Sequence, residues 1–260
     1  MPFRGRALRA AFPFTIAGEE PGIGAAKPAE WNDPTKHYRP VVARLLNARK
    51  PRSVLDAPSG TGWLRDALDF HCAVDGIDLF ATQPAGYRSF WHKNLDRGLP
   101  ETDARYEAMV CCEGIEHFGN PELFFSSARE RLVPGGMLIV TTPNTWYPTA
   151  RLQYLLRGFF PSFPCLAGKI VHGAHMHITP WSFAQLYTYL KLSNFSCIRL
   201  HAVAERKPRN LAEWLIGWPA LLYCKSRIRR ARTHEERDFW QQAGSAQSLF
   251  GRRLVVSAIA

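Results

Sequence analysis

The feature that most restricts the fold is a short apolar run that ends in an acidic residue and a glycine-containing loop. Residues 53–62 read Ser-Val-Leu-Asp-Ala-Pro-Ser-Gly-Thr-Gly, and a helix-like segment, Trp63 to Phe70, follows. This order predicts a buried strand that ends at Asp56, then a tight loop and a helix. Gly60 and Gly62 let the backbone approach a ligand, and the next helix directs free N–H groups toward it. A ligand-free turn would explain the glycines but not the acid.

Helix-like and strand-like segments alternate on both sides of this loop. The predicted helices are 37–48, 63–70 and 121–132, and the predicted strands are 53–56, 72–78, 106–112 and 137–142. Such alternation favours an α/β fold in which a parallel sheet is covered by helices on both faces. In sheets of this kind ligands bind at the carboxyl ends of the strands.

The second predicted strand also ends in an acid, Asp78, which lies 22 residues after Asp56. In nucleotide-type sites an acid at an offset of roughly 20 residues binds the ribose hydroxyls. The dinucleotide fingerprint G-x-G-x-x-G is absent, because Arg65 stands three residues after Gly62. The sequence also lacks the G-x-x-x-x-G-K-[ST] phosphate loop. Dehydrogenases and nucleoside triphosphatases are therefore disfavoured.

Together these motifs resemble the class I S-adenosylmethionine-dependent methyltransferases, whose first motif usually reads acid-x-Gly-x-Gly-x-Gly. Asp56, Gly60 and Gly62 match this motif, and Pro58 stands where the first glycine usually lies. The similarity continues through residues 132–144, which match the family's L-x-P-G-G turn and the strand after it.

The resemblance covers about residues 36–202 and implies a methyltransferase with a doubly wound, mostly parallel seven-stranded sheet, which is a Rossmann-like fold. A lid insertion and a C-terminal helical insertion are expected to interrupt it. The resemblance implies S-adenosyl-L-methionine as cofactor, Asp78 as the ribose-binding acid, and Asn94 and Leu95 against the adenine. The predicted cofactor-binding residues are Asp56, Ser59, Gly60, Gly62, Asp78, Leu79, Asn94, Leu95 and Cys112.

A run of potential ligands, residues 112–117 (Cys-Glu-Gly-Ile-Glu-His), follows the third predicted strand. Glu113, Glu116 and His117 suit Mg²⁺ or Mn²⁺ as carboxylate and imidazole ligands. An acid–base or structural role explains the same trio. The run resembles the ubiquinone-biosynthesis O-methyltransferases and the small-RNA 3′-end 2′-O-methyltransferases, which implies a metal-assisted reaction. Glu116 and His117 are candidate catalytic residues.

Three further histidines, His172, His175 and His177, precede Thr179 and Pro180. Imidazole titrates near neutral pH, so this cluster can supply a further ligand or a general base. We name His175 as the third candidate catalytic residue, although a surface or capping role explains any one of the three. Thr179 is predicted to cap the following helix, with Pro180 at its first position.

We expect six segments along the chain. They are an N-terminal extension (1–35), the cofactor-binding core (36–144), a lid or acceptor insertion (145–178), the end of the core (179–204), a basic amphipathic helical insertion (205–248) and a final strand (249–260). Six cysteines without regular spacing fit a reducing, cytoplasmic compartment rather than a zinc ribbon or a disulfide framework. The three arginines among the first 18 residues resemble a targeting signal only faintly.

Positive charge is confined to the second part of the chain. Residues 1–144 contain 17 Lys+Arg and 17 Asp+Glu, whereas residues 145–260 contain 16 and 5, so the second part carries the whole net charge of +11. Aromatic, aliphatic and basic residues gather in 146–164 and 211–230. This mixture suits an anionic membrane surface, single-stranded RNA, or ordinary packing with a solvated basic end.

We therefore expect an enzyme that methylates an oxygen of a lipid-linked, quinone-like or glycan acceptor, as a cytoplasmic protein peripheral to the membrane. No apolar run reaches the roughly 20 residues that a membrane-spanning helix requires. An RNA 2′-O-methyltransferase and a non-catalytic binding module that keeps the fold are the alternatives. Nucleic acid is the weaker candidate partner, since the sequence shows no RNA-binding motif.

Overall fold

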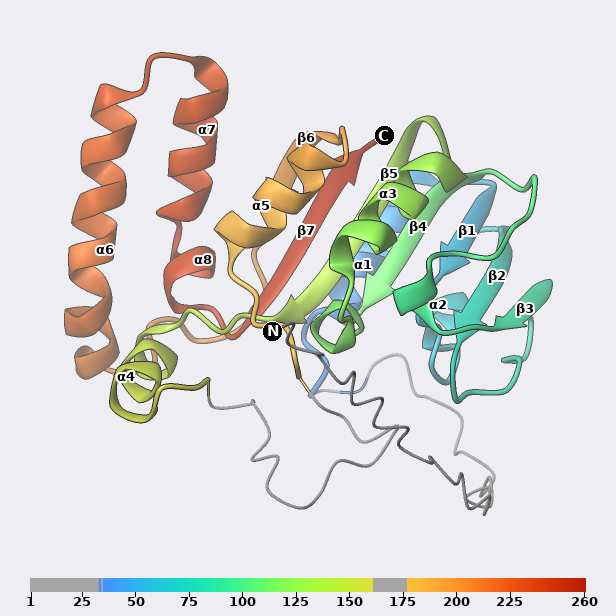
Figure 1. Ribbon diagram of the computed structural model, residues 1–260, viewed down its shortest axis with the longest axis horizontal. Coiled ribbons are helices and arrows are strands. Elements are labelled where there is room, and N and C mark those ends of the chain that lie inside the picture. The colour runs from blue at the N-terminus through green and yellow to red at the C-terminus, as the bar shows by residue number, and fades with distance from the viewer. Residues whose placement is uncertain (1–32, 34, 161–176) are drawn as a thin grey trace, which may run out of the picture.

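One sheet organises the computed structural model, which describes residue 33 and residues 35–160 and 177–260. Within these residues seven strands lie in the order β3-β2-β1-β4-β5-β7-β6 (Figure 1). Their bounds are β1 Ser53–Asp56, β2 Ala73–Asp78, β3 Ser89–His92, β4 Tyr106–Cys112, β5 Leu132–Pro143, β6 Ser196–Leu200 and β7 Arg253–Ile259. β1 to β5 are parallel, and β7 is antiparallel to both β5 and β6. The predicted mostly parallel seven-stranded sheet is confirmed.

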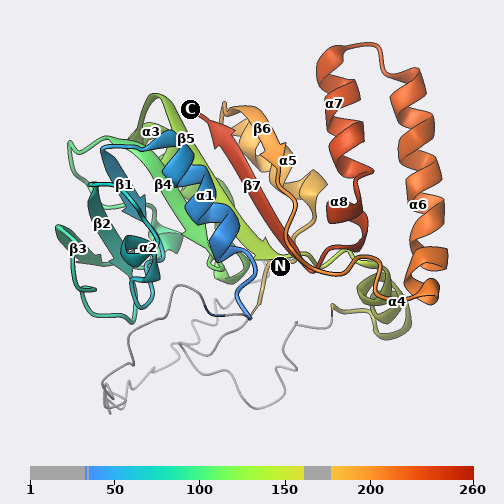
Figure 2. The ribbon, with the colours of Figure 1, turned by 180° about the vertical axis from the view of Figure 1, so that it is seen from behind.

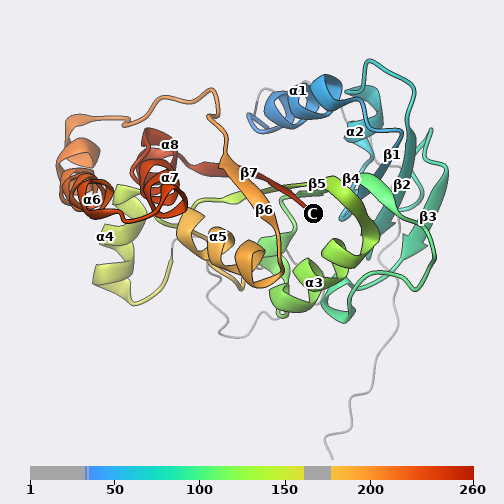
Figure 3. The same ribbon diagram turned by 90° about the horizontal axis from the view of Figure 1, so that it is seen from above.

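Helices cover both faces of the sheet. They are α1 Arg39–Arg49, α2 Trp63–Asp66, α3 Pro121–Arg131, α4 Pro148–Arg157, α5 Phe183–Leu192, α6 Leu211–Arg230, α7 His234–Ala243 and α8 Ala246–Phe250, with short 3₁₀ turns η1 Leu95–Arg97 and η2 Ile115–His117. α3 and α5 lie on one face, and α1 and α2 on the other (Figures 1 and 2). α4, α6, α7 and α8 lie beyond the β6–β7 end of the sheet (Figure 3).

The strand β4 shows why the core has two layers. Met109 and Cys111 are buried with the apolar residues of α3 and α5, whereas Ala108 and Val110 are buried with those of α1 and α2. Successive side chains of a strand point to opposite faces, so a strand covered on both sides is apolar throughout. The carboxyl ends of β1, β2, β4 and β5 therefore meet at one edge, where the loops that carry the predicted site emerge.

The start of α5 differs from the prediction. Ser182, not Thr179, caps this helix, because its Oγ accepts a hydrogen bond from Gln185 N–H and the Gln185 side chain accepts one from Ser182 N–H. Thr179 instead donates its hydroxyl to the Phe118 carbonyl (2.6 Å) and its N–H to the Glu116 carbonyl (3.0 Å). These two bonds fasten the segment before α5 to the loop after β4.

Several boundaries also differ. The helix predicted over 63–70 ends at Asp66, and the final strand begins at Arg253 because residues 246–250 form α8. β3, α4 and α7 were not predicted as separate elements. β3 has only four residues, none of them fully buried, and so lacks the apolar run that marks a strand in a sequence.

Candidate functional site

The loop after β1 and the end of β2 are joined through Asp78. Its Oδ2 accepts a hydrogen bond from Gly60 N–H (2.9 Å), and its Oδ1 accepts bonds from the N–H groups of Phe80 (2.8 Å) and Ala81 (3.0 Å). Parallel strands β1 and β2 place the two loops side by side. The predicted ribose-binding acid therefore lies directly against the predicted glycine loop.

The two glycines serve different purposes. Gly60 has φ of 51°, in the left-handed region, and a Cβ at this position would meet open space. Gly62 has φ of 82°, but there a Cβ would lie 2.2 Å from the Pro84 Cβ. Gly62 thus allows close packing, whereas Gly60 leaves the space above the loop open to a ligand.

Asp56 is fully buried at the end of β1. Burial raises the pKa of this carboxyl to about 7; the hydrogen bond from the Tyr87 hydroxyl (2.6 Å) opposes the shift, and the negative Asp78 adds to it. Among the described residues, Asp56 Oδ1 and the Ser59 hydroxyl have no hydrogen-bond partner although both are buried. Unsatisfied buried polar atoms are costly, so these two atoms fit a polar ligand seated at the loop.

The other predicted cofactor residues have varied surroundings. Leu79, beside Asp78, is 45% exposed, whereas Leu95 and Cys112 are buried. The Asn94 side chain accepts a hydrogen bond from Asp96 N–H (2.9 Å) and thereby caps the turn η1. The adenine contact assigned to Asn94 and Leu95 stays a prediction.

A cluster of one carboxylate and two imidazoles lies at the same edge of the sheet. Glu116, His117 and His177 each offer one ligand atom, and these atoms lie within 4.8 Å of one another. The two histidine rings are 5.0 Å apart between centroids and nearly perpendicular. Glu116 is buried and accepts a hydrogen bond from the Thr142 hydroxyl at the end of β5 (2.9 Å). The η2 turn brings Glu116 and His117 to His177, which lies before α5.

Glu113, which the sequence grouped with this cluster, lies in an ion pair instead. Its carboxylate binds Arg253 of β7, and its N–H donates to the Thr141 carbonyl (2.9 Å). The backbone turns sharply here, since Glu113 has φ of 51°, a conformation that side-chain-bearing residues rarely adopt. In the structure the third potential ligand beside Glu116 and His117 is His177, whereas Glu113 was predicted. His172 and His175 lie outside the described residues.

Burial shapes the electrostatics of both glutamates. Burial raises the pKa of Glu113 against the effect of Arg253, and burial together with the charge of Glu113 raises that of Glu116. A buried carboxylate of this kind is stabilised in its ionised form by a nearby cation. Gly114 connects the cluster to the glycine loop, because a Cβ there would lie 2.3 Å from the Pro58 Cδ.

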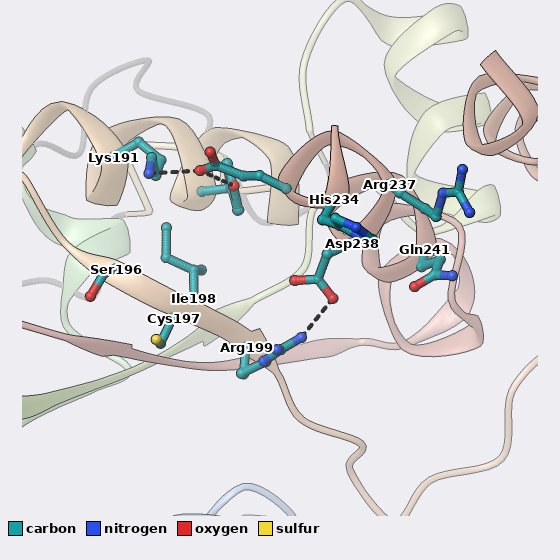
Figure 4. A pocket seen from close by; sticks show the side chains of 11 residues that line it. Lys191, Ser196, Cys197, Ile198, Arg199, His234, Arg237, Asp238 and Gln241 are labelled. Atoms are coloured by element: carbon teal, nitrogen blue, oxygen red, sulfur yellow. Dashed lines mark hydrogen bonds and ion pairs between the residues drawn. The ribbon is translucent and has the colours of Figure 1, made fainter. Parts of the chain in front are cut away.

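A cavity of about 620 Å³ lies elsewhere, between α5, β6 and α7 (Figure 4). Lys191 pairs with Glu235 (2.7 Å) and Arg199 with Asp238 (2.6 Å) across it. None of the predicted site residues within the described ranges lines this cavity, and the charges of its lining residues largely neutralise one another. We assign it no part in the chemistry.

Comparison with known proteins agrees with this geometry. The model of the methyltransferase domain family matches residues 31–200. A Mycolicibacterium smegmatis protein named "Probable S-adenosylmethionine-dependent methyltransferase" is 32% identical over 145 residues, 53% of this chain and 54% of that protein. The ubiquinone biosynthesis O-methyltransferase of Azorhizobium caulinodans is 27% identical over 134 residues, 44% of this chain and 51% of that protein. The chain thus matches about half the length of these relatives.

Two solved structures share the fold. The YcgJ protein of Bacillus subtilis superposes with a TM-score of 0.51 at 15% identity, over 85% of this chain and 96% of that one. A Haloferax volcanii protein solved with a methyltransferase activator gives a TM-score of 0.51 at 16% identity, over 87% and 91%. The chain belongs to the methyltransferase domain family, and the predicted assignment to the class I S-adenosylmethionine-dependent methyltransferases is confirmed.

Proposed function

We propose that this methyltransferase transfers the methyl group of S-adenosylmethionine to a hydroxyl oxygen of a lipid-linked, quinone-like or glycan acceptor. The observation that carries the proposal is the Glu116–His117–His177 cluster, which lies at the carboxyl edge of the sheet next to the glycine loop. The similarity to a ubiquinone biosynthesis O-methyltransferase supports an oxygen acceptor.

Asp56, Ser59, Gly60 and Asp78 would hold the cofactor. Asp56 and Ser59 offer unsatisfied polar atoms, and Gly60 offers open space. When bound, S-adenosylmethionine supplies a methyl group on an electrophilic sulfonium. The protein then has to align the acceptor oxygen with that methyl, exclude water and remove the hydroxyl proton.

The Glu116–His117–His177 cluster is suited to removing the proton of the acceptor hydroxyl. Without a bound cation, half-buried His117 beside Glu116 is placed to act as a general base, a role that imidazole often fills. One carboxylate and two imidazoles also form a donor set for a divalent cation, and the imidazoles favour Mn²⁺ over Mg²⁺. We propose that Glu116, His117 and His177 hold such a cation, which would lower the pKa of the acceptor hydroxyl.

Methyl transfer from labelled cofactor to lipid, glycan and RNA fractions tests the reaction. We expect label in the lipid or glycan fraction, and a roughly 100-fold loss of rate in His117→Ala with unchanged binding of S-adenosylhomocysteine. Label in RNA would replace the proposal with a 2′-O-methyltransferase. No label in any fraction despite cofactor binding would favour a non-catalytic module.

Elemental analysis and titration with Mn²⁺ test the cation separately. Binding of Mn²⁺ by the native chain, weakened in His177→Ala, is expected. Activity that survives EDTA in a protein without bound metal would leave His117 as a general base and reject the cation.

A further inference from the structure

The outer surfaces of α4 and α6 expose several large apolar side chains. On α4, Leu155 and Leu156 are 79% and 75% exposed, whereas Arg151 and Gln153 are half-buried. Among the described residues, Arg151 Nε and Gln153 Oε1 are buried without a hydrogen-bond partner. A helix at a water interface normally buries its leucines and exposes such polar groups. The second half of α4 therefore exposes leucines while the polar atoms of Arg151 and Gln153 are partly covered.

α6 has apolar residues on two opposite sides. Its inner side packs on α7 and α8, and Gly217 lies so close to Phe250 that a Cβ would come within 2.2 Å of the ring. The outer stripe consists of Leu211, Leu215, Trp218 and Leu222, at helical spacings of four, three and four residues. These four side chains are 45–71% exposed. A contiguous apolar stripe on the exposed side of a helix is typical of an interaction site with a protein or a membrane.

Cations continue and flank this stripe. Lys225 and Arg229 extend it by the same spacing, Arg209 precedes the helix, and all three are exposed. Across the fully described helices α4 and α6, Glu213 is the only acid, and it is buried. An apolar strip bordered by cations without acids is complementary to an anionic lipid surface.

The surface formed by α4 and α6 is connected through the chain to the carboxyl edge of the sheet, where the Glu116–His117–His177 cluster lies. α6 is the outermost helix, and α4 lies at its amino end (Figures 1 and 3). α4 begins six residues after Thr142, which binds Glu116. Among the helices of the described ranges, none combines the length and the apolar character needed to cross a bilayer.

We infer that the α4–α6 face, defined by Leu155 and Leu156 of α4 and the outer stripe of α6, binds the surface of an anionic bilayer. This inference rests on the proposed function for the bilayer origin of the acceptor, and α4 connects this face to the end of β5, where Thr142 binds Glu116. The rings of Trp214 and Trp218, stacked 6.0 Å apart, are suited to the headgroup level.

Vesicle flotation with the full chain tests the inference without cofactor or turnover. We expect binding to phosphatidylcholine–phosphatidylglycerol vesicles and roughly tenfold weaker binding to phosphatidylcholine alone. The double variant Leu215→Gln, Leu222→Gln should lose roughly tenfold on both. Leu192→Gln is the matched control, because Leu192 is 70% exposed on α5, outside the face, and should bind like the native chain.

A charge variant separates the electrostatic contribution. Arg229→Gln should weaken binding to anionic vesicles roughly fivefold and leave binding to neutral vesicles unchanged. Arg105 is exposed and directly precedes β4, outside the α4–α6 face. The control variant Arg105→Gln should therefore bind both kinds of vesicle like the native chain. Native and variant chains should share the same circular dichroism and the same affinity for S-adenosylhomocysteine.

Three results would overturn the inference. The first is a native chain that does not float with anionic vesicles. The second is a Leu215→Gln, Leu222→Gln variant that floats like the native chain. The third is a native chain that sediments as a dimer while this variant sediments as a monomer, which would assign the face to a second copy. Binding to single-stranded RNA without binding to vesicles would assign the face to nucleic acid. Failure of methyl transfer with intact flotation would reject the proposed reaction but not this surface.

Discussion

Two carboxylates 22 residues apart, Asp56 and Asp78, have different surroundings at the carboxyl edge of the sheet. Asp78 accepts hydrogen bonds from three backbone N–H groups, whereas Asp56 accepts one from a phenol and leaves Oδ1 unsatisfied. Asp78 therefore stabilises the conformation of the glycine loop, whereas Oδ1 of Asp56 is available to a polar ligand.

Replacing Asp78 should disorder the loop it holds. In Asp78→Ala we expect S-adenosylhomocysteine to bind at least roughly tenfold more weakly in calorimetry, since three hydrogen bonds to a charged group are lost. The exposed Asp69→Ala is the control and should bind normally. Unchanged affinity in Asp78→Ala would contradict the assigned cofactor site.

Asp56 should make stability depend on pH. The unfolded chain releases this proton near the ordinary pKa of 3.8, whereas the folded chain keeps it until about 7, so folding stability falls as pH rises through that window. Asp56→Asn lacks this penalty. Its melting temperature relative to the native chain should rise by a few degrees between about pH 4 and pH 8. A difference that does not vary with pH would show that Asp56 stays ionised.

At the scale of elements, α6 is tied to the core through Glu213. This buried carboxylate accepts hydrogen bonds from Arg209 N–H (2.9 Å) and the Thr149 hydroxyl (3.2 Å) and pairs with Arg252. Burial would raise its pKa, but the bonds from Arg209 and Arg252 outweigh burial and lower it. One side chain thus joins α4, α6 and the residue before β7.

Glu213→Gln should loosen this end of the molecule. A lowered pKa stabilises the fold above the ordinary value of 4.5, and that stability is lost as pH falls through the folded-state pKa. The variant should melt several degrees lower at pH 7 and converge with the native chain in acid. Glu130→Gln, exposed on α3, should melt like the native chain. An equal deficit at all pH values would argue against an ion pair.

The edge strand β6 is closed by a side chain of α7. Gln242 Oε1 accepts from Leu200 N–H (2.7 Å), and its Nε2 donates to the Ile198 carbonyl (3.1 Å). Gln242→Ala should lower the free energy of unfolding by about 1–3 kcal/mol, because two backbone groups lose their partner. Faster hydrogen exchange at 196–200 would locate the effect. The neighbouring, exposed Gln241→Ala should leave both measurements unchanged.

Elements with a strong local signal could be predicted, whereas pairings across the chain could not. Residues 53–56 and 106–112 have the predicted bounds, because apolar runs mark them locally. The partners of Glu113 and Asp56, namely Arg253 and Tyr87, lie far away in the sequence and follow no spacing rule. The predicted segment limits within 145–178 and 205–248 stay predictions.

At the scale of the whole molecule, the net charge and the predicted cofactor-binding loop lie in different parts of the chain. The net charge of +11 belongs to residues 145–260, whereas the glycine loop and Asp78 belong to the balanced part. Salt weakens interactions between exposed charges beyond a Debye length, about 10 Å at 0.1 M, more than it weakens a buried polar site.

Rising ionic strength should therefore separate two binding events. Binding to anionic vesicles should weaken steeply with added salt, while the affinity for S-adenosylhomocysteine should change little. Flotation and calorimetry across the same salt series measure both. A parallel loss of both affinities would show that the basic part also contacts the cofactor.

β7 lies between β5 and β6 in the sheet but follows both in the chain. β6 therefore cannot pair with its neighbour in the sheet, β7, until residues 253–259 have been synthesised. Arg252 and Arg253, the partners of Glu213 and Glu113, are made at the same late moment. Glu113, next to the Glu116–His117–His177 cluster in the chain, and Glu213, which joins α4 to α6, therefore both depend on the start of the same strand.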